Sequence, residues 1–170
     1  MENNLIIRLL DPSPQLSEIA QLNELLKTCY SSAKSLADEF AAASESVDAT
    51  ARRVQEGECY LAFVSDHLVG CVILRTKSKV SAPSWYQKPG VASFGRLAVR
   101  SDHQNQGIGT ALIRFIEARA KRLGCSELAL DTSENSHSLI SFYESLGFQI
   151  VSHHQWSRTS FKSVVLSKKI

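Results

Sequence analysis

The segment from Phe94 to Gly124 limits the possible folds of this chain more than any other. It begins with an apolar stretch and continues as a polar loop. The residues that follow have a helical pattern, and Gly107 and Gly109 lie in its first turn. Apolar residues then recur with the spacing of one helix face, at Ile108, Ala111, Leu112, Phe115, Ile116 and Leu123. The segment therefore predicts a β-strand, a short loop and an α-helix in direct succession.

The first turn of this predicted helix is suited to binding an anion. Because glycine has no side chain, the backbone amides around Gly107 and Gly109 can approach a bulky ligand closely. These amides have no acceptor within the helix, and the helix dipole adds partial positive charge there. We expect a phosphate or a pyrophosphate at this position.

The composition is that of one globular domain. The chain has 170 residues, of which 44% are hydrophobic and 21% are charged, and this is enough to bury a core. The net charge of +2 comes without a basic run, which argues against a nucleic-acid partner. The cysteines form no CxxC pair and show no metal-site spacing with the histidines. We expect no metal, and reduced thiols at Cys29, Cys59, Cys71 and Cys125.

Targeting signals are absent from the sequence given. The start, Met1 to Asn4, has no basic region followed by an apolar one. No apolar run approaches the ~20 residues that a membrane span needs. We therefore expect a cytoplasmic protein without a membrane partner.

The rest of the chain alternates between strand and helix patterns. The expected strands are 5–10, 59–65, 68–76, 91–99, 127–131, 148–152 and 161–167, with a hairpin turn at Asp66-His67. The expected helices are 15–30, 45–56, 108–123 and 139–146, whereas 31–46 has weak periodicity and 77–90 is typical of a loop. Strand–helix–strand units pair in parallel and hairpins pair antiparallel, so we predict a mixed α/β sheet.

Three kinds of loop place glycines at the start of a helix. A Walker A loop needs a lysine after its last glycine, and Thr110 follows Gly109 here. A dinucleotide-binding loop needs a third glycine where this chain has Leu112, and its turn comes straight off the strand, whereas seven residues separate Val99 from Gly107. Asp131 lies near the distance of a ribose-binding acid, so a dinucleotide enzyme stays as an alternative.

The third kind of loop fits best. The run Gln104-Asn-Gln-Gly107-Ile-Gly109 resembles the Q/R-x-x-G-x-G/A loop of the GNAT superfamily of N-acetyltransferases. Downstream, Phe142-Tyr143-Glu-Ser-Leu-Gly147-Phe148 resembles the FYxxxGF segment of the same family. The resemblance covers roughly residues 91–151. It implies a single-domain GNAT fold over residues 1–170, of class α/β (α+β-like).

The family fold has a mixed, mostly antiparallel sheet of about six or seven strands, flanked by about four helices, with splayed fourth and fifth strands. Within it, residues 91–151 would form the acyl-coenzyme A-binding core. Residues 1–65 would form the variable region on the acceptor side.

The resemblance also implies an acetyl-coenzyme A-dependent acyltransferase. It would transfer the acetyl group to a primary amine by direct attack in a ternary complex. The acceptor would be a small-molecule amine or a protein amino group, and a homodimer is compatible with the resemblance. The competing interpretation is a coenzyme A-binding regulatory domain without turnover.

Site residues follow from the two motifs. Tyr143 would protonate the departing coenzyme A sulfur. Backbone groups of Leu97, Ala98 and Val99 would bind the pantetheine arm as an added strand, and an N–H near Leu97 or Ala98 would stabilise the oxyanion. The pyrophosphate would bind the amides of Gln104, Asn105, Gln106, Gly107, Ile108, Gly109 and Thr110.

Two further residues complete the expected cofactor site, namely Asn135 and Phe142. Asn135 would contact the pantetheine arm, although Ser136 fits the usual spacing to Tyr143 better. Both Asn135 and Ser136 are also good helix caps, which is the ordinary structural role of such residues.

Several residues have two interpretations. Tyr143 shares an apolar stripe with Leu139 and Leu146, which is typical of a core tyrosine. Trp85 and Tyr86 form either a lid over the acceptor or a buried anchor for their loop. His153 and His154 face opposite ways if they are in a strand, and we favour a surface loop.

The general base is not assigned by the sequence. Many GNAT proteins have a glutamate on the fourth strand, where this chain has Ala92-Ser93-Phe94-Gly95. The missing glutamate favours the regulatory domain, and the retained Tyr143 counts against it. A water chain or a carboxylate remains as a base, the carboxylates being Glu24, Asp38 and Glu39.

Overall fold

We describe a computed structural model of the chain, over residues 4–31, 43–79, 81–157 and 159–170. It divides into two compact units, one made of Met1–Leu74 with Arg96–Phe115 and one made of Arg75–Gly95 with Ile116–Ile170. The boundary crosses two strands, between Leu74 and Arg75 and between Gly95 and Arg96, and one helix, between Phe115 and Ile116. Among the described residues, no helix is both long enough and apolar enough to cross a membrane.

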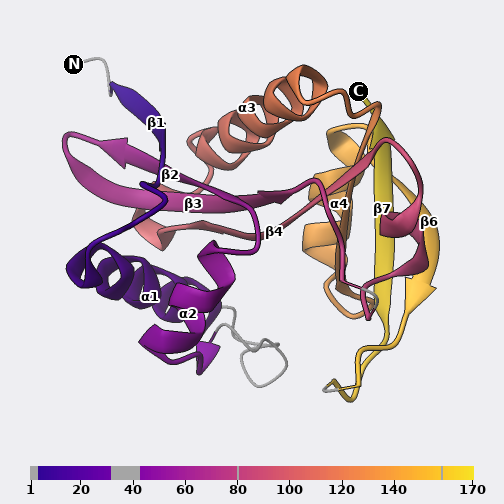
Figure 1. Cartoon of the computed structure of the whole chain (residues 1–170), viewed down its shortest axis with the longest axis horizontal. Coiled ribbons are helices and arrows are strands. Elements are labelled where there is room, and N and C mark those ends of the chain that lie inside the picture. The colour runs from indigo at the N-terminus through magenta and orange to yellow at the C-terminus, as the bar shows by residue number, and fades with distance from the viewer. Residues whose placement is uncertain (1–3, 32–42, 80, 158) are drawn as a thin grey trace. The chain divides into compact units, whose positions relative to one another are not determined.

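Seven strands of the described chain form a sheet in the order β1-β2-β3-β4-β5-β7-β6 (Figure 1). These strands are β1 (Leu5–Leu9), β2 (Glu58–Val64), β3 (His67–Arg75), β4 (Val91–Val99), β5 (Glu127–Ser133), β6 (Gln149–His154) and β7 (Ser163–Lys169). The α-helices of the described residues are α1 (Leu16–Ser31), α2 (Val47–Val54), α3 (Ile108–Arg122) and α4 (His137–Ser145). Short 3₁₀ turns cover Ser84–Gln87 and Ser101–His103.

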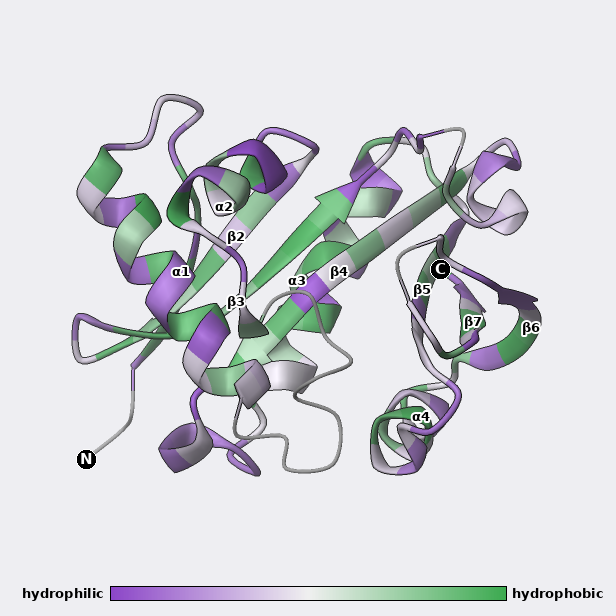
Figure 2. Ribbon diagram, turned by 90° about the horizontal axis from the view of Figure 1, so that it is seen from below, coloured by the Kyte–Doolittle hydropathy of each residue, from purple (hydrophilic) through white to green (hydrophobic). Residues whose placement is uncertain are grey.

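The first unit buries both faces of β2 and β3, whereas β1 is partly exposed. The helices α1 and α2 cover one face, and the first half of α3 covers the other (Figures 1 and 2). Because side chains alternate along a strand, Leu61 packs in the core with α1 while its neighbour Tyr60 contacts the Phe115 ring of α3. Figure 2 shows the resulting hydrophobic strands behind an α1 that alternates between apolar and polar residues. A strand covered on both sides is apolar at nearly every position, as β3 is.

The second unit is built around β5 and β7, which pair antiparallel from Glu127 opposite Lys169 to Ser133 opposite Ser163. One set of buried residues contains Tyr86, Val91, Ala129 and Val165. A separate group of aromatic rings consists of Phe94, Phe142, Tyr143 and Phe148. Val91 and Phe94 are three positions apart on β4, so they lie on opposite faces of it.

The predicted fold class is confirmed, including the relation between the fourth and fifth strands. The pairs β1–β2, β2–β3, β5–β7 and β6–β7 are antiparallel. The pair β4–β5 is parallel and is formed by Val91–Ser93 with Glu127–Ala129, at the start of both strands. This short ladder is what the expected splay of these strands requires.

Several predicted boundaries were wrong for local reasons. The hairpin turn is Ser65-Asp66, where both residues have positive φ (48° and 64°), and His67 already belongs to β3. The helix predicted from Glu45 begins at Val47, because the Ser46 hydroxyl accepts the Ala49 N–H and caps it.

Toward the end of the chain the strands are shifted from their predicted positions. The predicted strand 148–152 extends to His154, so both histidines lie in β6 and not in the following loop. The last strand begins at Ser163 rather than at 161 and runs to Lys169, and β5 continues two residues beyond 131. The loop predicted for 77–90 contains the 3₁₀ turn Ser84–Gln87.

Gly70 in β3 gives a prediction about packing. A Cβ on Gly70 would lie 2.9 Å from the backbone oxygen of Ala98, whereas a Cβ on Gly95 would meet only the tip of the Arg75 side chain, at 3.1 Å. Gly70→Ala should lower the free energy of unfolding by about 1–3 kcal/mol because neither backbone can yield easily. Gly95→Ala is the matched control and should change it by less than about 1 kcal/mol. Urea denaturation measures both, and equal stability of the two variants would contradict this account.

Candidate functional site

The loop between β4 and α3 is braced by its own glutamines. The Arg100 N–H donates to the Val69 carbonyl at 2.8 Å, where β4 ends beside β3. The Gln104 side chain then donates to the Val99 carbonyl at 3.0 Å, and the Gln106 side chain donates to the Asp102 carbonyl at 3.1 Å. Both glutamine side chains therefore stabilise the loop, and the groups left to meet a ligand are backbone amides.

Two residues of this loop have left-handed backbone conformations. Asn105 has φ 60° and Gly107 has φ 82°. Asparagine tolerates this region better than other residues with a Cβ, and glycine adopts it without strain. A Cβ added at Gly107 would meet none of the described residues within 4 Å, so the space beside it is open in the described part of the chain.

The start of α3 presents unsatisfied amides. The first hydrogen bond of the helix runs from the Ala111 N–H to the Gly107 carbonyl, at 2.9 Å. The N–H groups of Ile108, Gly109 and Thr110 therefore have no acceptor within the helix. The first turn carries no acidic residue, while the last turn carries Arg119, Lys121 and Arg122. The helix end and the open space beside Gly107 together suit an anion.

The charged residues before the loop compensate one another. Arg100 donates to Asp102 through Nε and NH2, at 3.1 and 2.7 Å, and His103 lies 2.8 Å from the same carboxylate. Hydrogen bonds from Arg100, and then from His103, lower the pKa of Asp102 to about 2. The carboxylate is thus ionised at neutral pH and offsets the charge of Arg100.

The expected pantetheine-binding residues, Leu97, Ala98 and Val99, follow a distortion of β4. Arg96 has φ 55°, in the middle of the strand. Its carbonyl accepts a hydrogen bond from Cys71 Sγ at 3.3 Å, and the carbonyl of Leu97 accepts one from the Tyr30 hydroxyl at 3.1 Å. Burial raises the pKa of both the Cys71 thiol and the Tyr30 hydroxyl, so both groups keep the protons they donate.

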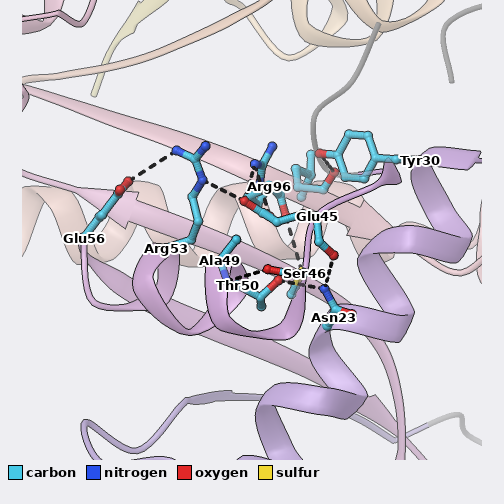
Figure 3. Close-up of polar contacts among 11 residues, drawn as sticks. Asn23, Tyr30, Glu45, Ser46, Ala49, Thr50, Arg53, Glu56 and Arg96 are labelled. Atoms are coloured by element: carbon cyan, nitrogen blue, oxygen red, sulfur yellow. Dashed lines mark hydrogen bonds and ion pairs between the residues drawn. The ribbon is translucent and has the colours of Figure 1, made fainter. Parts of the chain in front are cut away.

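A buried carboxylate lies beside this distortion and was missed by the sequence analysis. Glu45, with a side chain only 6% exposed, binds Arg53 Nε at 3.0 Å and Arg96 NH2 at 3.2 Å. Its carbonyl accepts the Asn23 side-chain amide, which also binds Thr50 (Figure 3). We call Asn23, Glu45, Thr50, Arg53 and Arg96 the Glu45 cluster. Nothing in the Ser- and Ala-rich sequence around Glu45 indicates its burial.

In the second unit, Tyr143 is buried by aromatic rings. Its ring centroid lies 6.0 Å from those of Phe94 and Phe148, and Tyr143 is 6% exposed. Leu139, which shares its helical stripe, is 38% exposed. The burial of Tyr143 therefore comes from β4 and from Phe148 rather than from the predicted stripe. The ring packing suits a core tyrosine and a buried proton donor equally.

The glycine of the second motif ends α4. Gly147 has φ 91°, and the Phe148 N–H folds back onto the Tyr143 carbonyl at 3.1 Å. A left-handed glycine after a helix is the usual way to make this reversal. The motif thus fixes the turn that returns Phe148 to the Tyr143 ring.

Of the two residues before α4 that were considered for the pantetheine arm, Ser136 has the more suitable surroundings. Asn135 is exposed, and its backbone N–H binds Ser133 Oγ at 3.2 Å. Ser136 is 2% exposed, and its hydroxyl has no hydrogen-bond partner among the described residues. A buried hydroxyl left in this way is costly, so it suits a position that a ligand completes.

The aromatic loop before β4 is anchored to β5. The Tyr86 hydroxyl and the Trp156 ring N–H both donate to Asp131, at 2.9 and 2.8 Å, and the Trp85 ring N–H donates to Glu127. Tyr86 is buried, so the anchor interpretation is confirmed for it. Asp131 is engaged by two aromatic donors, which weakens its interpretation as a ribose-binding acid.

The candidate bases and histidines have varied surroundings. Glu24 is exposed on α1, and Asp38 and Glu39 lie outside the described residues. Ser93 is buried in the short ladder with β5. His153 is exposed, whereas His154 packs against the Trp156 ring at 4.6 Å, as the alternation of a strand requires.

The expected site residues are divided between the two units. The first unit brings together Leu97–Val99 and the loop from Gln104 to Thr110. The second unit contains Asn135, Phe142 and Tyr143.

Comparisons with known proteins agree on one family. Residues 19–148 match the profile described as "Acetyltransferase (GNAT) family". Over 109 residues the chain is 29% identical to "Uncharacterized N-acetyltransferase YvbK" of Bacillus subtilis (strain 168), covering 64% of this chain and 63% of that protein. The chain thus spans less than two thirds of the length of this relative.

Solved structures show the same fold. A GNAT family acetyltransferase from Elizabethkingia anophelis, with acetyl-CoA bound, aligns over 100% of both chains at TM-score 0.67 and 20% identity. The ribosomal-protein-S18-alanine N-acetyltransferase from Escherichia coli aligns over 98% of this chain and 94% of its own at TM-score 0.72 and 16% identity. At these identities the likeness shows the fold alone.

The left-handed backbone at Asn105 gives a second prediction. Asn105→Ala should lower the free energy of unfolding by about 1–2 kcal/mol, because alanine is strained at positive φ. Asn105→Gly should leave it within about 1 kcal/mol of the wild-type value. Thermal and urea unfolding of both variants measure the difference. A glycine variant as unstable as the alanine variant would contradict the assigned conformation.

Proposed function

The chain belongs to the acetyltransferase (GNAT) family, and on this premise we propose that it is an acetyl-coenzyme A-dependent N-acetyltransferase. It transfers an acetyl group to a primary amine by direct attack in a ternary complex. The start of α3 supports this most, because Gly107 leaves open space beside three amides without helical acceptors. In this proposal residues 1–170 act as one domain, with the acyl-coenzyme A core in 91–151 and the acceptor side in 1–65.

The pyrophosphate of coenzyme A binds the loop from Gln104 to Thr110. Its negative charge meets the backbone amides and the positive end of the α3 dipole. The side chains of Gln104 and Gln106 hold the loop in shape through Val99 and Asp102. Binding energy from this remote group holds the thioester in place for reaction.

The pantetheine arm extends along β4. The backbone groups of Leu97, Ala98 and Val99 bind its amides as an added strand would. A backbone N–H of Leu97 or Ala98 donates to the thioester oxygen and stabilises the negative charge that develops there. Asn135, with the buried Ser136 beside it, and Phe142 are also proposed to contact the arm.

Acyl transfer follows from these positions. The neutral amine attacks the thioester carbon, a C–N bond forms, and the carbonyl electrons move to oxygen. When the oxyanion collapses, the C–S bond breaks and coenzyme A leaves as a thiolate, which Tyr143 protonates. The proton lost by the amine passes to solvent water, solvent water returns a proton to Tyr143, and no metal takes part.

The acceptor is an amine of one of two classes, a small molecule or a protein amino group. The name of the Escherichia coli neighbour describes a protein acceptor, and this supports testing peptides together with small amines. Thiols at Cys71 and Cys125 support a cytoplasmic location, where disulfides are rare.

A coenzyme A-binding domain without turnover is the second candidate. Residues 91–99 contain no carboxylate, and Ser93 is buried in the ladder with β5. This candidate predicts that coenzyme A binds and that no amine is acetylated, so an activity assay distinguishes it from the acetyltransferase.

Turnover of acetyl-coenzyme A tests the proposed function. We expect thiol release with at least one acceptor from a panel of lysine, spermidine and a peptide with a free amino terminus. Tyr143→Phe should then lower kcat about tenfold and leave KM for acetyl-coenzyme A within about twofold, because a thiol of pKa ~8.5 can also leave unaided.

Three other outcomes identify the alternatives. Thermal stabilisation by coenzyme A without turnover of any amine supports the binding domain. Stabilisation by NAD in place of coenzyme A supports a dinucleotide enzyme. A Tyr143→Phe variant as active as the wild type makes Tyr143 a core residue.

Gly107 and Gly124 form a matched pair for testing the loop. Both have φ 82°, and a Cβ at either would have no neighbour within 4 Å among the residues that the structure describes. Valine therefore brings similar backbone strain at both positions. We expect Gly107→Val to raise the Kd for coenzyme A at least tenfold, because its side chain occupies the space of the pyrophosphate. Gly124→Val should keep the Kd within about twofold by titration calorimetry. Equal effects of the two variants would refute the assignment of the loop.

A further inference from the structure

The left-handed residue Arg96 determines which backbone groups β4 presents. An L-residue with a side chain costs about 1–2 kcal/mol in this conformation, so it persists only where its surroundings hold it. Arg96 has φ 55°, and the residues on either side belong to the same strand. The side chains that stabilise Arg96 in this conformation therefore also determine the direction of the backbone groups of β4.

Two side chains hold consecutive carbonyls at this point. Cys71 Sγ, from β3, donates to the Arg96 carbonyl at 3.3 Å. The Tyr30 hydroxyl, from the last turn of α1, donates to the Leu97 carbonyl at 3.1 Å. Neither bond is a strand-to-strand bond between backbones, so side chains set the direction of both peptide planes.

The Glu45 cluster holds the side chain of the same residue. Arg96 NH2 lies 3.2 Å from Glu45, and the carboxylate also binds Arg53 (Figure 3). Removing one partner from such a buried ion pair leaves an uncompensated charge, which resists displacement of Arg96. Asn23, on α1, in turn donates to the Glu45 backbone carbonyl and to Thr50 of α2, so the backbone of Glu45 is tied to both helices.

Peptide geometry transmits this restraint to the amides. A trans peptide is planar, so its N–H points away from the carbonyl of the same plane. Fixing the Arg96 carbonyl against Cys71 therefore aims the Leu97 N–H away from Cys71. The Ala98 N–H lies close enough to the Cys71 sulfur to oppose the rise in the pKa of that thiol. Of the two amides, that of Leu97 is the one directed away from the Cys71 thiol.

We propose that Cys71 and Tyr30 are positioning residues for acyl transfer, which keep the Leu97 N–H directed as the oxyanion donor. Cys71 holds the Arg96 carbonyl, which shares a peptide plane with this N–H, and Tyr30 holds the next peptide plane through the Leu97 carbonyl, so both planes that flank the Leu97 Cα are restrained. This inference rests on the proposed function. Glu45 supports the same geometry through the side chain of Arg96. Tyr30 lies on α1 and Cys71 on β3, and both are outside residues 91–151. Elements beyond the expected cofactor core therefore set the direction of the Leu97 N–H.

The oxyanion donor acts in the transition state, so its loss should lower kcat and leave the binding of coenzyme A unchanged. Removing one such donor outright costs about 10²–10³ in kcat, so loosening its direction should cost about tenfold. Coenzyme A binding depends on the loop and the arm, and should not change. A merely structural role would lower stability without separating kcat from KM.

Tyr30→Phe tests the proposal, with Tyr60→Phe as its matched control. Tyr60, on β2 of the same unit, donates its hydroxyl to Glu58 at 2.6 Å and packs against the Phe115 ring of α3. With the best acceptor from the amine panel, we expect Tyr30→Phe to lower kcat about tenfold, with KM for acetyl-coenzyme A and Kd for coenzyme A within about twofold. Tyr60→Phe should keep kcat within about twofold.

Cys71 provides a second, independent pair. Cys71→Ser keeps a hydrogen-bond donor and should retain kcat within about threefold, whereas Cys71→Ala removes the donor and should lower kcat about tenfold. This pair decides the question if Tyr30→Phe does not fold.

Each outcome has one meaning. An active wild type with undiminished kcat in both Tyr30→Phe and Cys71→Ala overturns the positioning role alone. An equal fall of kcat in Tyr60→Phe also overturns it, because the effect would then be general to the unit. A wild type without turnover of any amine overturns the proposed function, and the positioning role with it.

Discussion

The left-handed backbone at Arg96 is the feature on which β4 depends. Upstream of it, Val91–Ser93 forms a parallel ladder with β5. Downstream, the carbonyls of Arg96 and Leu97 bind side chains of β3 and α1. The strained residue thus separates a stretch that builds the sheet from a stretch whose amides can serve a ligand. The strain is offset by the Glu45 cluster, two hydrogen bonds and the packing of Ala98 in the core.

The same strategy is repeated in the loop that follows. Asn105 and Gly107 have positive φ, and glutamine side chains occupy the carbonyls of Val99 and Asp102. Side chains satisfy the acceptors of the loop, so its amides at the start of α3 remain for an anion. Both in β4 after Arg96 and in this loop, side chains bind the backbone carbonyls, and backbone N–H groups remain for a ligand.

The second unit uses aromatic packing where the first uses polar contacts. Phe94, Tyr143 and Phe148 meet at ring-centroid distances of 6.0 Å. Rigid rings fix the Tyr143 side chain more firmly than a helical stripe with an exposed Leu139 would. Trp85 and Tyr86 bind carboxylates of β5, which anchors the loop before β4.

The sequence by itself determined the fold class and the course of β4, the following loop and α3. Val91–Val99 was predicted to the residue, because an apolar run, a glycine-containing turn and a 3.6-residue period are local signals. The loop motif and the Phe142–Phe148 motif indicated the family for the same reason. The left-handed conformation of Arg96 and the burial of Glu45 left no such signal. They arise because α1, the segment before α2, and β3, which are distant in sequence, bring Tyr30, Glu45 and Cys71 to one strand. Only the tertiary structure decides which side chains meet there.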